Sequence, residues 1–393
     1  MRTVHNAFAK VVFAFLTVLL LLFGCFFSAR AEPMENEPPI ALSAPSLLLM
    51  DVDSGAVIFE KNADETRPVA SVTKLMTALL VLEKVESGAV GWQDRVTVSP
   101  NAAGATGSQA LLDAHVQYDL ETLFQATVMA SGNDSAVALA EYLAGTEEAF
   151  ARQMNARAAE LGLQATHYVN CTGLPAQGQY TCARDVARLC REIAKYPAYF
   201  QAASVWMDDL VHPSGRKTAL TNTNRLVRFY KDCDGFKTGS TNEAKYCVCA
   251  TAKRDGMRLA AIVLGASSSQ TRFDEARAML DYGFAAYRRV TLCQAGNQLD
   301  YTVPVTLGAR DQVGVAVGGT VSMLMKTGQE KAVSMEVTLP QSVGAPVKKG
   351  DEIGEIRLLL EGKVIASLPA VAAEDVRMPG VLEGLFRILE SWK

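Results

Sequence analysis

The stretch "PVASVTKLMTALL", residues 68–80, decides the fold, because it places Ser71 and Lys74 at the start of an apolar run. Lysine is a poor core residue and serine an indifferent helix former, so both are unexpected where a buried helix begins. Residues three apart share one face of a helix, which brings the lysine amine within reach of the serine hydroxyl. A partly desolvated lysine has a lowered pKa and can take that hydroxyl's proton. The pair indicates either nucleophilic chemistry or a serine that merely caps the helix.

The S-x-x-K spacing carries little information by itself, since Ser214 and Lys217 repeat it in "SGRK". That copy follows a proline and contains a glycine, so it predicts a turn with solvated charges. The copy at Ser71 differs because it begins an apolar helix, whose N-terminal field favours an oxyanion beside the serine.

A second motif, "MASGNDSAVALAEYL", supplies Ser131 and Asn133 sixty residues further on. A hydroxyl and an amide at the end of a helix can hydrogen-bond both a catalytic lysine and a substrate amide. The same residues equally suit a turn or an N-cap before the next helix. Ser99-Pro100-Asn101 repeats the S-x-N pattern, and its proline predicts a loop.

A third motif, "DGFKTGSTN", supplies Lys237, Thr238 and Gly239. On a strand, Lys237 and Gly239 point one way and Thr238 the other. The lysine suits a carboxylate, and the glycine would let a ligand backbone approach closely, as an added strand does. The copy at residues 326–328, "KTG" in a different context, predicts a hairpin turn with an exposed lysine.

Strand and helix patterns alternate around these motifs. Residues 46–64 predict two strands around the turn "DSG", and residues 118–162 follow a helical pattern. Residues 245–266 predict a hairpin with "DG" at its turn, and residues 272–289 predict a closing helix. We therefore expect an α/β domain over residues 40–289, in which segments from both ends pair in one sheet.

The sequence changes character after residue 290. Short alternating runs separated by Gly, Pro and Asn predict a small all-β domain over residues 290–373, with no enzyme-like constellation. The tail, residues 374–393, ends in "GVLEGLFRILESWK", whose apolar and charged residues fall on opposite sides of a helix. We expect residues 380–393 to lie in a membrane surface. The alternative is a helix docked on its own domain or on a partner.

The N-terminus predicts export. Residues 1–31 combine basic residues, an apolar run and a small-residue end at Ala29 and Ala31, as a cleavable signal peptide does. An uncleaved anchor is the alternative, and a lipoprotein site at Cys25 is weaker. Residues 32–39 are polar and proline-rich, which is typical of a linker. The chain is thus expected in the extracytoplasmic space or at the outer face of the cytoplasmic membrane.

Charge and cysteine content exclude other classes of function. The first 31 residues hold three of the 38 basic and none of the 42 acidic residues, so cleavage leaves 35 against 42, a net charge of −7. Nucleic acid is therefore not an expected partner. Seven cysteines remain without metal-ligand spacing, and we expect small buried thiols and no metal. No histidine has a Ser-His-Asp-like context, and His115 and His212 are expected in surface loops.

The three motifs occur in the order found in active-site serine penicillin-recognising enzymes. The surrounding stretches "LLLMDVDSGAVIFEKNADETRPVASVTKLMT", "HYVNCTGLPAQGQYTCARDVARL" and "DGFKTGSTNEAKYC" resemble the D-alanyl-D-alanine carboxypeptidases, the low-molecular-mass penicillin-binding proteins. The resemblance covers residues 40–290 densely and extends into the β domain and the tail. It implies a penicillin-recognising, serine transpeptidase-like α/β (α+β) domain followed by an all-β domain and an amphipathic C-terminal helix.

The resemblance also implies roles for individual residues. Ser71 would be the nucleophile, Lys74 its general base and Ser131 a proton relay. Asn133 would hold the substrate and orient the base. The remaining residues would bind substrate or tune the site: Lys237 electrostatically, Thr238 and Arg272 at the terminal carboxylate, Gly239 on the strand, and Ser240 as an oxyanion-hole donor with the Ser71 amide. The substrate would be a peptidoglycan stem peptide ending in D-Ala–D-Ala, β-lactams would acylate the same serine, and no cofactor is needed.

Three alternatives remain at this point. A class A β-lactamase uses the same motifs but lacks the β domain and the tail. An endopeptidase that cuts peptidoglycan cross-links would use the same residues in a groove of different shape. A wall-binding protein with an inactive site would not require all three motifs to be intact.

Overall fold

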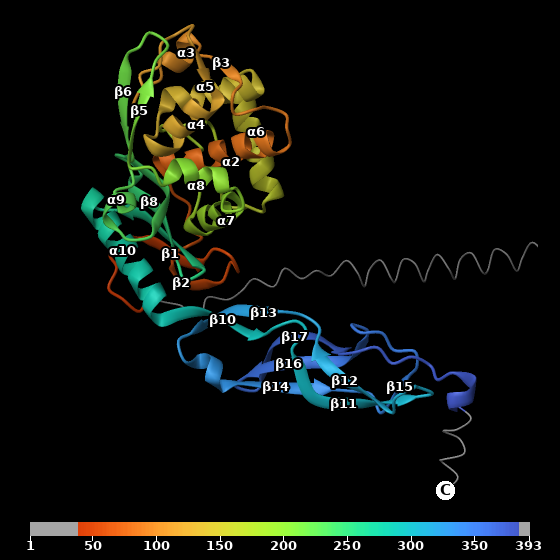
Figure 1. Cartoon of the computed structure of the whole chain (residues 1–393). Coiled ribbons are helices and arrows are strands. Elements are labelled where there is room, and N and C mark those ends of the chain that lie inside the picture. The colour runs from red at the N-terminus through yellow and green to blue at the C-terminus, as the bar shows by residue number, and fades with distance from the viewer. Residues whose placement is uncertain (1–37, 385–393) are drawn as a thin grey trace, which may run out of the picture. The chain divides into compact units, whose positions relative to one another are not determined.

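A computed structural model describes residues 38–384, and its first domain is built on a five-stranded antiparallel sheet (Figure 1). The strand order is β2-β1-β9-β8-β7. The strands are β1 (Ser46–Asp51), β2 (Val57–Lys61), β7 (Cys233–Thr241), β8 (Lys245–Arg254) and β9 (Met257–Ala266). Because β1 pairs with β9, the start and the end of the domain meet in one sheet, as the sequence predicts. In the described part of the chain β7, which carries the K-T-G motif, ends the sheet.

The two faces of this sheet belong to two different hydrophobic cores. Along β8, Cys247 and Cys249 join one cluster while Val248 joins the other, which is the alternation of a strand buried on both faces. The helix α10 (Ser269–Ala286) contributes Met279 and Leu280 to the second cluster.

The first cluster contains the helical layer of the domain. Its helices are the 3₁₀ turn η1 (Ala70–Thr73), α2 (Lys74–Glu86), α3 (Pro100–Ala103), α4 (Leu120–Met129), α5 (Asn133–Ala144), α6 (Glu147–Glu160), α7 (Ala183–Ile193) and α8 (Pro197–Ala203), with α9 (Leu226–Phe229) leading into β7. Two short hairpins complete the domain: β3 (Arg95–Thr97) with β4 (Gln117–Asp119), and β5 (Met207–Val211) with β6 (Lys217–Thr221).

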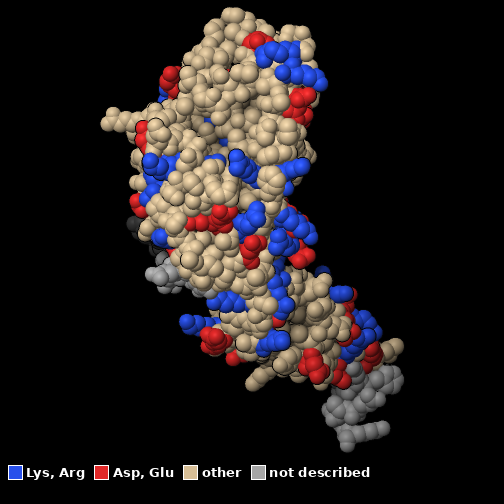
Figure 2. Space-filling model, turned by 90° about the vertical axis from the view of Figure 1, so that its left-hand side faces the viewer, with Lys and Arg blue, Asp and Glu red and all other residues tan. Residues whose placement is uncertain are grey.

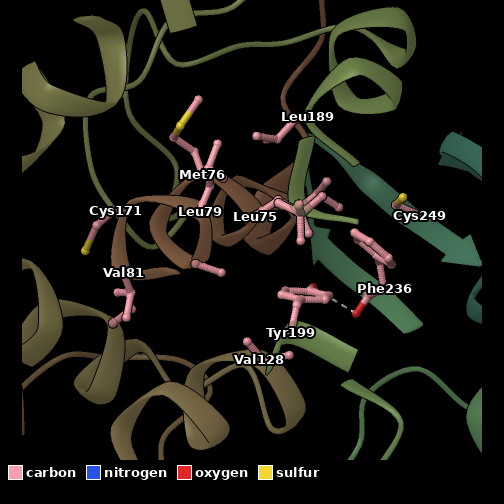
Figure 3. Close-up of a cluster of buried hydrophobic side chains, with 14 of the residues drawn as sticks. Leu75, Met76, Leu79, Val81, Val128, Cys171, Leu189, Tyr199, Phe236 and Cys249 are labelled. Carbon is pink, nitrogen blue, oxygen red and sulfur yellow. Dashed lines mark hydrogen bonds between the residues drawn. The ribbon is translucent and has the colours of Figure 1, made fainter. Parts of the chain in front are cut away.

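The helix α2 is the centre of this layer, since every residue from Lys74 to Leu82 is buried. A helix that is apolar on all sides can only be stable inside a core. It packs against α4, α5, α6, α7 and α8. Figure 3 shows Leu75 of α2 beside the aromatic pair Tyr199 and Phe236, whose ring centroids are 4.6 Å apart. The buried helix expected after Ser71 is confirmed.

The second domain is all-β. Its six-stranded sheet has the order β14-β16-β17-β12-β11-β15, and β10 and β13 form a separate antiparallel pair. The elements are β10 (Tyr287–Cys293), β11 (Gln298–Thr306), β12 (Gln312–Val317), β13 (Val321–Lys326), η2 (Gln329–Ala332), β14 (Val333–Thr338), β15 (Val343–Gly344), β16 (Glu352–Leu360) and β17 (Lys363–Ala372). Its core is a single cluster of mostly Val, Ile, Leu and Ala side chains.

Three details differ from the sequence-based expectations. Ser71 lies in the 3₁₀ turn η1, so the α-helix proper begins at Lys74. Ser99-Pro100-Asn101 is not a loop, because Ser99 caps α3 and proline is well tolerated at the first helical position. The closing helix begins at Ser269 behind the cap Ser268 and ends at Ala286, after which Tyr287 is buried as the first residue of β10.

The predicted signal peptide and most of the predicted linker lie outside the described residues, as do residues 385–393 of the tail. Among residues 38–384, no helix is both long and apolar enough to span a bilayer. On the face drawn in Figure 2, basic and acidic side chains lie in small interspersed groups.

Candidate active site

The amine of Lys74 is the point where the first two motifs meet. Its Nζ donates to Ser71 Oγ at 3.1 Å, to Asn133 Oδ1 at 2.5 Å and to the main-chain oxygen of Thr172 at 2.7 Å. The side chain is 1% exposed. Three acceptors from three separate segments therefore fix a buried amine against the hydroxyl of Ser71.

Burial lowers the pKa of Lys74 to about 7, while the nearby Cys171, Asp134 and Glu147 act in the opposite direction. Desolvation disfavours the ammonium form, so the group gives up its proton near neutrality. A neutral amine beside a serine hydroxyl is what a general base requires.

The third motif contributes a second buried amine. Lys237 is 1% exposed and donates to the main-chain oxygen of Thr238 at 3.1 Å. Burial lowers its pKa well below the ordinary value, and the neighbouring cations Lys74 and Arg272 lower it further. All three motifs thus converge in one electrostatically coupled site, as their order along the sequence suggests.

Two glycines let separate segments pack directly on the backbone around Ser71. A Cβ on Gly239 would lie 2.3 Å from the Val69 oxygen, and a Cβ on Gly173 would lie 2.0 Å from the Ala70 oxygen. Both positions are also within 3 Å of the Ser71 nitrogen. From the sequence, Gly239 is expected to leave room for a ligand backbone. In the structure, Gly239 instead leaves room for the backbone of the chain's own η1 turn.

Ser131 is held in a strained conformation at the end of α4. Its φ is +63°, in the left-handed region that disfavours serine, and its side chain is 3% exposed. Within residues 38–384 its Oγ has no hydrogen-bond partner. Buried hydroxyls are nearly always paired, so a strained and unpaired one indicates a functional group awaiting a partner.

Asn133 divides its amide between two segments. Its Oδ1 accepts from Lys74, and its Nδ2 donates to the Thr106 oxygen at 2.5 Å. An amide nitrogen carries two hydrogens, so one remains for a substrate carbonyl. The contact with Lys74 supports the expected role of Asn133 in orienting that lysine. Binding of a substrate by Asn133 would use its second amide hydrogen.

The expected carboxylate-binding residues lie around the edge strand. Thr238 is 4% exposed and donates from Oγ1 to the Oγ1 of Thr223 at 2.8 Å, while Ser240 is exposed. Arg272 is only 8% exposed, and its Nη1 donates to the Gly239 oxygen at 3.1 Å and to the Cys247 oxygen at 3.2 Å. Burial lowers the pKa of Arg272 to about 10. Arg272 is thus anchored on the motif strand rather than on the surface.

The loop that supplies the third acceptor of Lys74 is not predicted from the sequence. The side-chain oxygen of Asn170 accepts from the Thr172 nitrogen and hydroxyl, from the Gly173 nitrogen and from Gln179, and its Nδ2 donates to the Leu174 oxygen. Asn170 therefore fixes the backbone that carries the Thr172 oxygen. The asparagine followed by Thr-Gly was the available signal, since such residues build turns around their own side chains.

Thr77 docks the same loop on α2. Its hydroxyl donates to the Cys171 oxygen at 2.7 Å, one helical turn after Lys74 binds the Thr172 oxygen. The loop also forms a wall of a hollow of about 410 Å³ beside the η1 turn, which is lined by residues including Ala70, Leu174 and Thr241.

The cysteines and histidines are the remaining candidates for disulfide or metal chemistry. The seven cysteines are buried and form no disulfide in the described part of the chain, so the expectation of buried thiols is confirmed. His212 was expected in a surface loop but is 1% exposed, because the β5–β6 hairpin folds it against Tyr118 at 2.7 Å and Thr218 at 2.8 Å. Residues 38–384 contain no group of three or more His, Cys, Asp or Glu side chains suited to a metal.

Comparison with known proteins identifies the family. A model of the family D-alanyl-D-alanine carboxypeptidase matches residues 32–268, and a model of the C-terminal domain of penicillin-binding protein 5 matches residues 287–378. The chain belongs to the D-alanyl-D-alanine carboxypeptidase family. It is therefore a serine-type carboxypeptidase and a penicillin-binding protein, and the match of the second domain contradicts the class A β-lactamase alternative.

Similar proteins span nearly the whole chain. The D-alanyl-D-alanine carboxypeptidase DacF of Bacillus subtilis is 37% identical over 376 residues, which are 95% of this chain and 96% of the relative. The carboxypeptidase DacC of Escherichia coli is 34% identical, over 90% of this chain and 89% of its own length. The crystal structure of penicillin binding protein 5 from Haemophilus influenzae is 29% identical, with a TM-score of 0.71, covering 87% of this chain and all of that one.

The lowered pKa of Lys74 predicts a pH dependence of acylation. Below pH 7 the amine is protonated and cannot take the Ser71 proton, so the rate should rise through about pH 7 and level off above it. The measurement is the second-order rate constant for acylation by a fluorescent penicillin between pH 5 and 9. A rate constant that stays flat or falls through pH 7 would contradict a neutral Lys74 acting as the base.

Replacing Asn170 should slow acylation and shift that profile. Asn170→Ala removes five loop hydrogen bonds, so the Thr172 oxygen loses its fixed position on the Lys74 amine. Loss of an acceptor destabilises the ammonium, so the rising limb should move to lower pH while the plateau falls about tenfold or more. Asn101→Ala, which removes one surface bond to Glu141, is the matched control. An unchanged plateau and midpoint would show that the loop does not act on Lys74.

Proposed function

We propose that Ser71 is the nucleophile and that Lys74 is its general base. The observation that carries this proposal is the buried Lys74 amine, which contacts the Ser71 hydroxyl and whose pKa is lowered to about 7 by burial. In the acylation step, Lys74 Nζ takes the Ser71 proton as Oγ attacks the carbonyl carbon of the penultimate D-alanine. The C–N bond then breaks and the leaving D-alanine receives a proton on its nitrogen.

Ser131 would relay that proton. Its buried Oγ has no partner among residues 38–384, so it is free to accept from a lysine amine and donate to the leaving nitrogen. In the second half of the reaction, a water attacks the acyl carbon, the Ser71–acyl bond breaks, and Ser71 Oγ regains a proton. The products are free D-alanine and a peptide shorter by one residue, and no cofactor takes part.

The oxyanion of the tetrahedral intermediate would be bound by two main-chain N–H groups, those of Ser71 and Ser240. The close packing of Gly239 on the backbone before Ser71 supports this pairing, because it brings the end of β7 beside the η1 turn. The position of β7 at the edge of the sheet supports binding of the peptide as an added strand.

The other residues of the site would bind and orient the substrate. Arg272 supplies positive charge beside the terminal carboxylate, Thr238 supplies a hydroxyl, and Lys237 tunes the site electrostatically. Asn133 orients Lys74 and offers its second amide hydrogen to the peptide. The substrate is a peptidoglycan stem pentapeptide ending in D-Ala–D-Ala, and β-lactams, which resemble that dipeptide, acylate the same serine.

We also propose that the mature chain works in the extracytoplasmic space, attached to the outer face of the cytoplasmic membrane through residues 380–393. The described beginning of this segment supports the proposal, since Val381 and Leu382 are 85% and 74% exposed. Two apolar side chains in water at the start of an amphipathic stretch favour insertion into an interface. Residues 385–393 lie outside the described part of the chain.

Replacing the nucleophile should abolish the reaction. Ser71→Ala, made in the chain from residue 32 onward, should release no D-alanine from a peptide ending in D-Ala–D-Ala and form no penicillin adduct, while its thermal unfolding stays close to that of the parent. Ser214→Ala, at the other S-x-x-K copy, is the matched control and should retain full activity. Release of D-alanine by folded Ser71→Ala would exclude Ser71. If the parent releases none, cross-linked peptidoglycan is the next substrate, which tests the endopeptidase alternative.

Deleting residues 380–393 should free the protein from membranes without changing its chemistry. The truncated chain should remain in the supernatant with lipid vesicles, whereas the longer chain should sediment with them, and kcat/KM for the peptide should be equal for both. Equal sedimentation of the two chains would overturn the proposed anchor.

A further inference from the structure

A short segment beside the K-T-G strand carries a hydroxyl that neither the motifs nor the comparisons single out. In "TNTN", residues 221–224, the Oγ1 of Thr223 accepts from the Oγ1 of Thr238 at 2.8 Å. Thr238 is 4% exposed and Thr223 is partly exposed. Since Thr238 donates its only hydroxyl proton to Thr223, the proton of Thr223 is the one left to point outward.

Two buried asparagines fix the position of Thr223. Asn222 Nδ2 donates to the Ala203 and Val205 oxygens, both at 2.8 Å, and Asn224 Nδ2 donates to the Gly235 oxygen at 2.8 Å. These asparagines are 4% and 1% exposed. The nitrogen of Thr223 itself donates to the oxygen of Met129, the last residue of α4, at 3.1 Å.

Hydrogen bonds of Thr223 and its two neighbours thus fix Thr223 between the C-terminal end of α8, the end of α4 and the start of β7. Such support is not required for a hydroxyl that only fills space at a loop surface. It is required for a hydroxyl that binds a ligand at a defined position, because pre-organised donors bind more strongly than mobile ones.

Thr223 also lines a hollow with positive charge. This hollow, of about 690 Å³, is bounded by residues that include Thr223, Arg225, Ser269 and Arg272. Arg272 is 8% exposed, and among residues 38–384 its Nε has no hydrogen-bond partner. A buried guanidinium with a free N–H beside an outward hydroxyl is a recognition pattern for a carboxylate.

The distance from the nucleophile fits one amino-acid residue. A Cβ on Gly239 would lie 2.8 Å from the Ser71 nitrogen, and Thr238 is the adjacent residue on the strand, about 3.8 Å away between Cα atoms. Ser71 attacks the carbonyl carbon of the penultimate D-alanine, and the leaving D-alanine carries its carboxylate one residue beyond that scissile bond. The Thr238–Thr223 pair begins one residue along β7 from the contact with Ser71, which is the spacing that this carboxylate requires.

We propose that Thr223 is a specificity-determining residue that donates a hydrogen bond to the terminal carboxylate of the substrate. The inference rests on the proposed function and extends it, because it makes the Thr238–Thr223 hydroxyl pair and Arg272 one carboxylate clamp. The clamp selects peptides with a free C-terminal carboxylate over peptides whose terminus is blocked, since a neutral carboxamide gains less from the Thr223 donor beside the Arg272 cation.

The test uses two peptides that differ only at the end, one closing in D-Ala–D-Ala and the other in D-Ala–D-alaninamide. Cleavage of either peptide gives the same shortened product, which is quantified by mass spectrometry. The enzyme concentration is set high enough to measure the slower cleavage of the amide peptide. Thr223→Val keeps the shape of the side chain and removes the hydroxyl. We expect its kcat/KM for the free acid to fall about 10- to 100-fold with little change for the amide.

Two variants serve as controls. Thr223→Ser keeps a hydroxyl and should restore most of the preference for the free acid. Thr221→Val, at an exposed residue lining the same hollow, should behave as the parent. An equal loss on both peptides, or no loss on either, would overturn the role of Thr223 while leaving the proposed function intact. A parent that cleaves neither peptide would overturn the proposed function, and this inference with it.

Discussion

The buried amine of Lys74 is the constraint on which the rest of the structure depends. Removing an ammonium group from water is costly, and the protein meets that cost by lowering the pKa of the group to about 7 and giving it three acceptors. The acceptors come from the η1 turn, from the start of α5 and from the loop after residue 170. Each of these segments has to be placed accurately, because a misplaced acceptor would leave a polar group unpaired in the core.

The packing of α2 supplies that accuracy. Its first nine residues are buried, and five other helices pack against it, so Lys74 projects from the most constrained element of the domain. The edge strand β7 is equally constrained, since Gly239 allows it to touch the backbone beside Ser71. A site built on such elements is organised before the substrate arrives, which is where most electrostatic catalysis originates.

The polar groups of the site fall into two sets. One set is fully paired inside the protein, as with Lys74, the Asn170 loop and the asparagines around Thr223. The other set is buried but incomplete, and within residues 38–384 it includes the Ser131 hydroxyl and the Arg272 Nε. Unpaired buried groups are costly in a folded protein, so the presence of these two in the site suggests that the substrate completes them. The paired groups hold the unpaired Ser131 hydroxyl and Arg272 Nε in position.

The three motifs, their order and the buried helix after Ser71 were predictable from the sequence, because they follow from local spacing and hydrophobic periodicity. The pairing of the two ends of the domain is a contact between distant segments, and only the order of strands and helices along the chain indicated it. Only the tertiary structure decided that Thr172, Asn170 and Thr223 join the site, and that Gly239 is required by the chain's own backbone. Their contributions are a main-chain oxygen, loop hydrogen bonds and a hydroxyl pair between remote segments. Such interactions leave no periodic pattern in the sequence, because they exist only after the chain has folded.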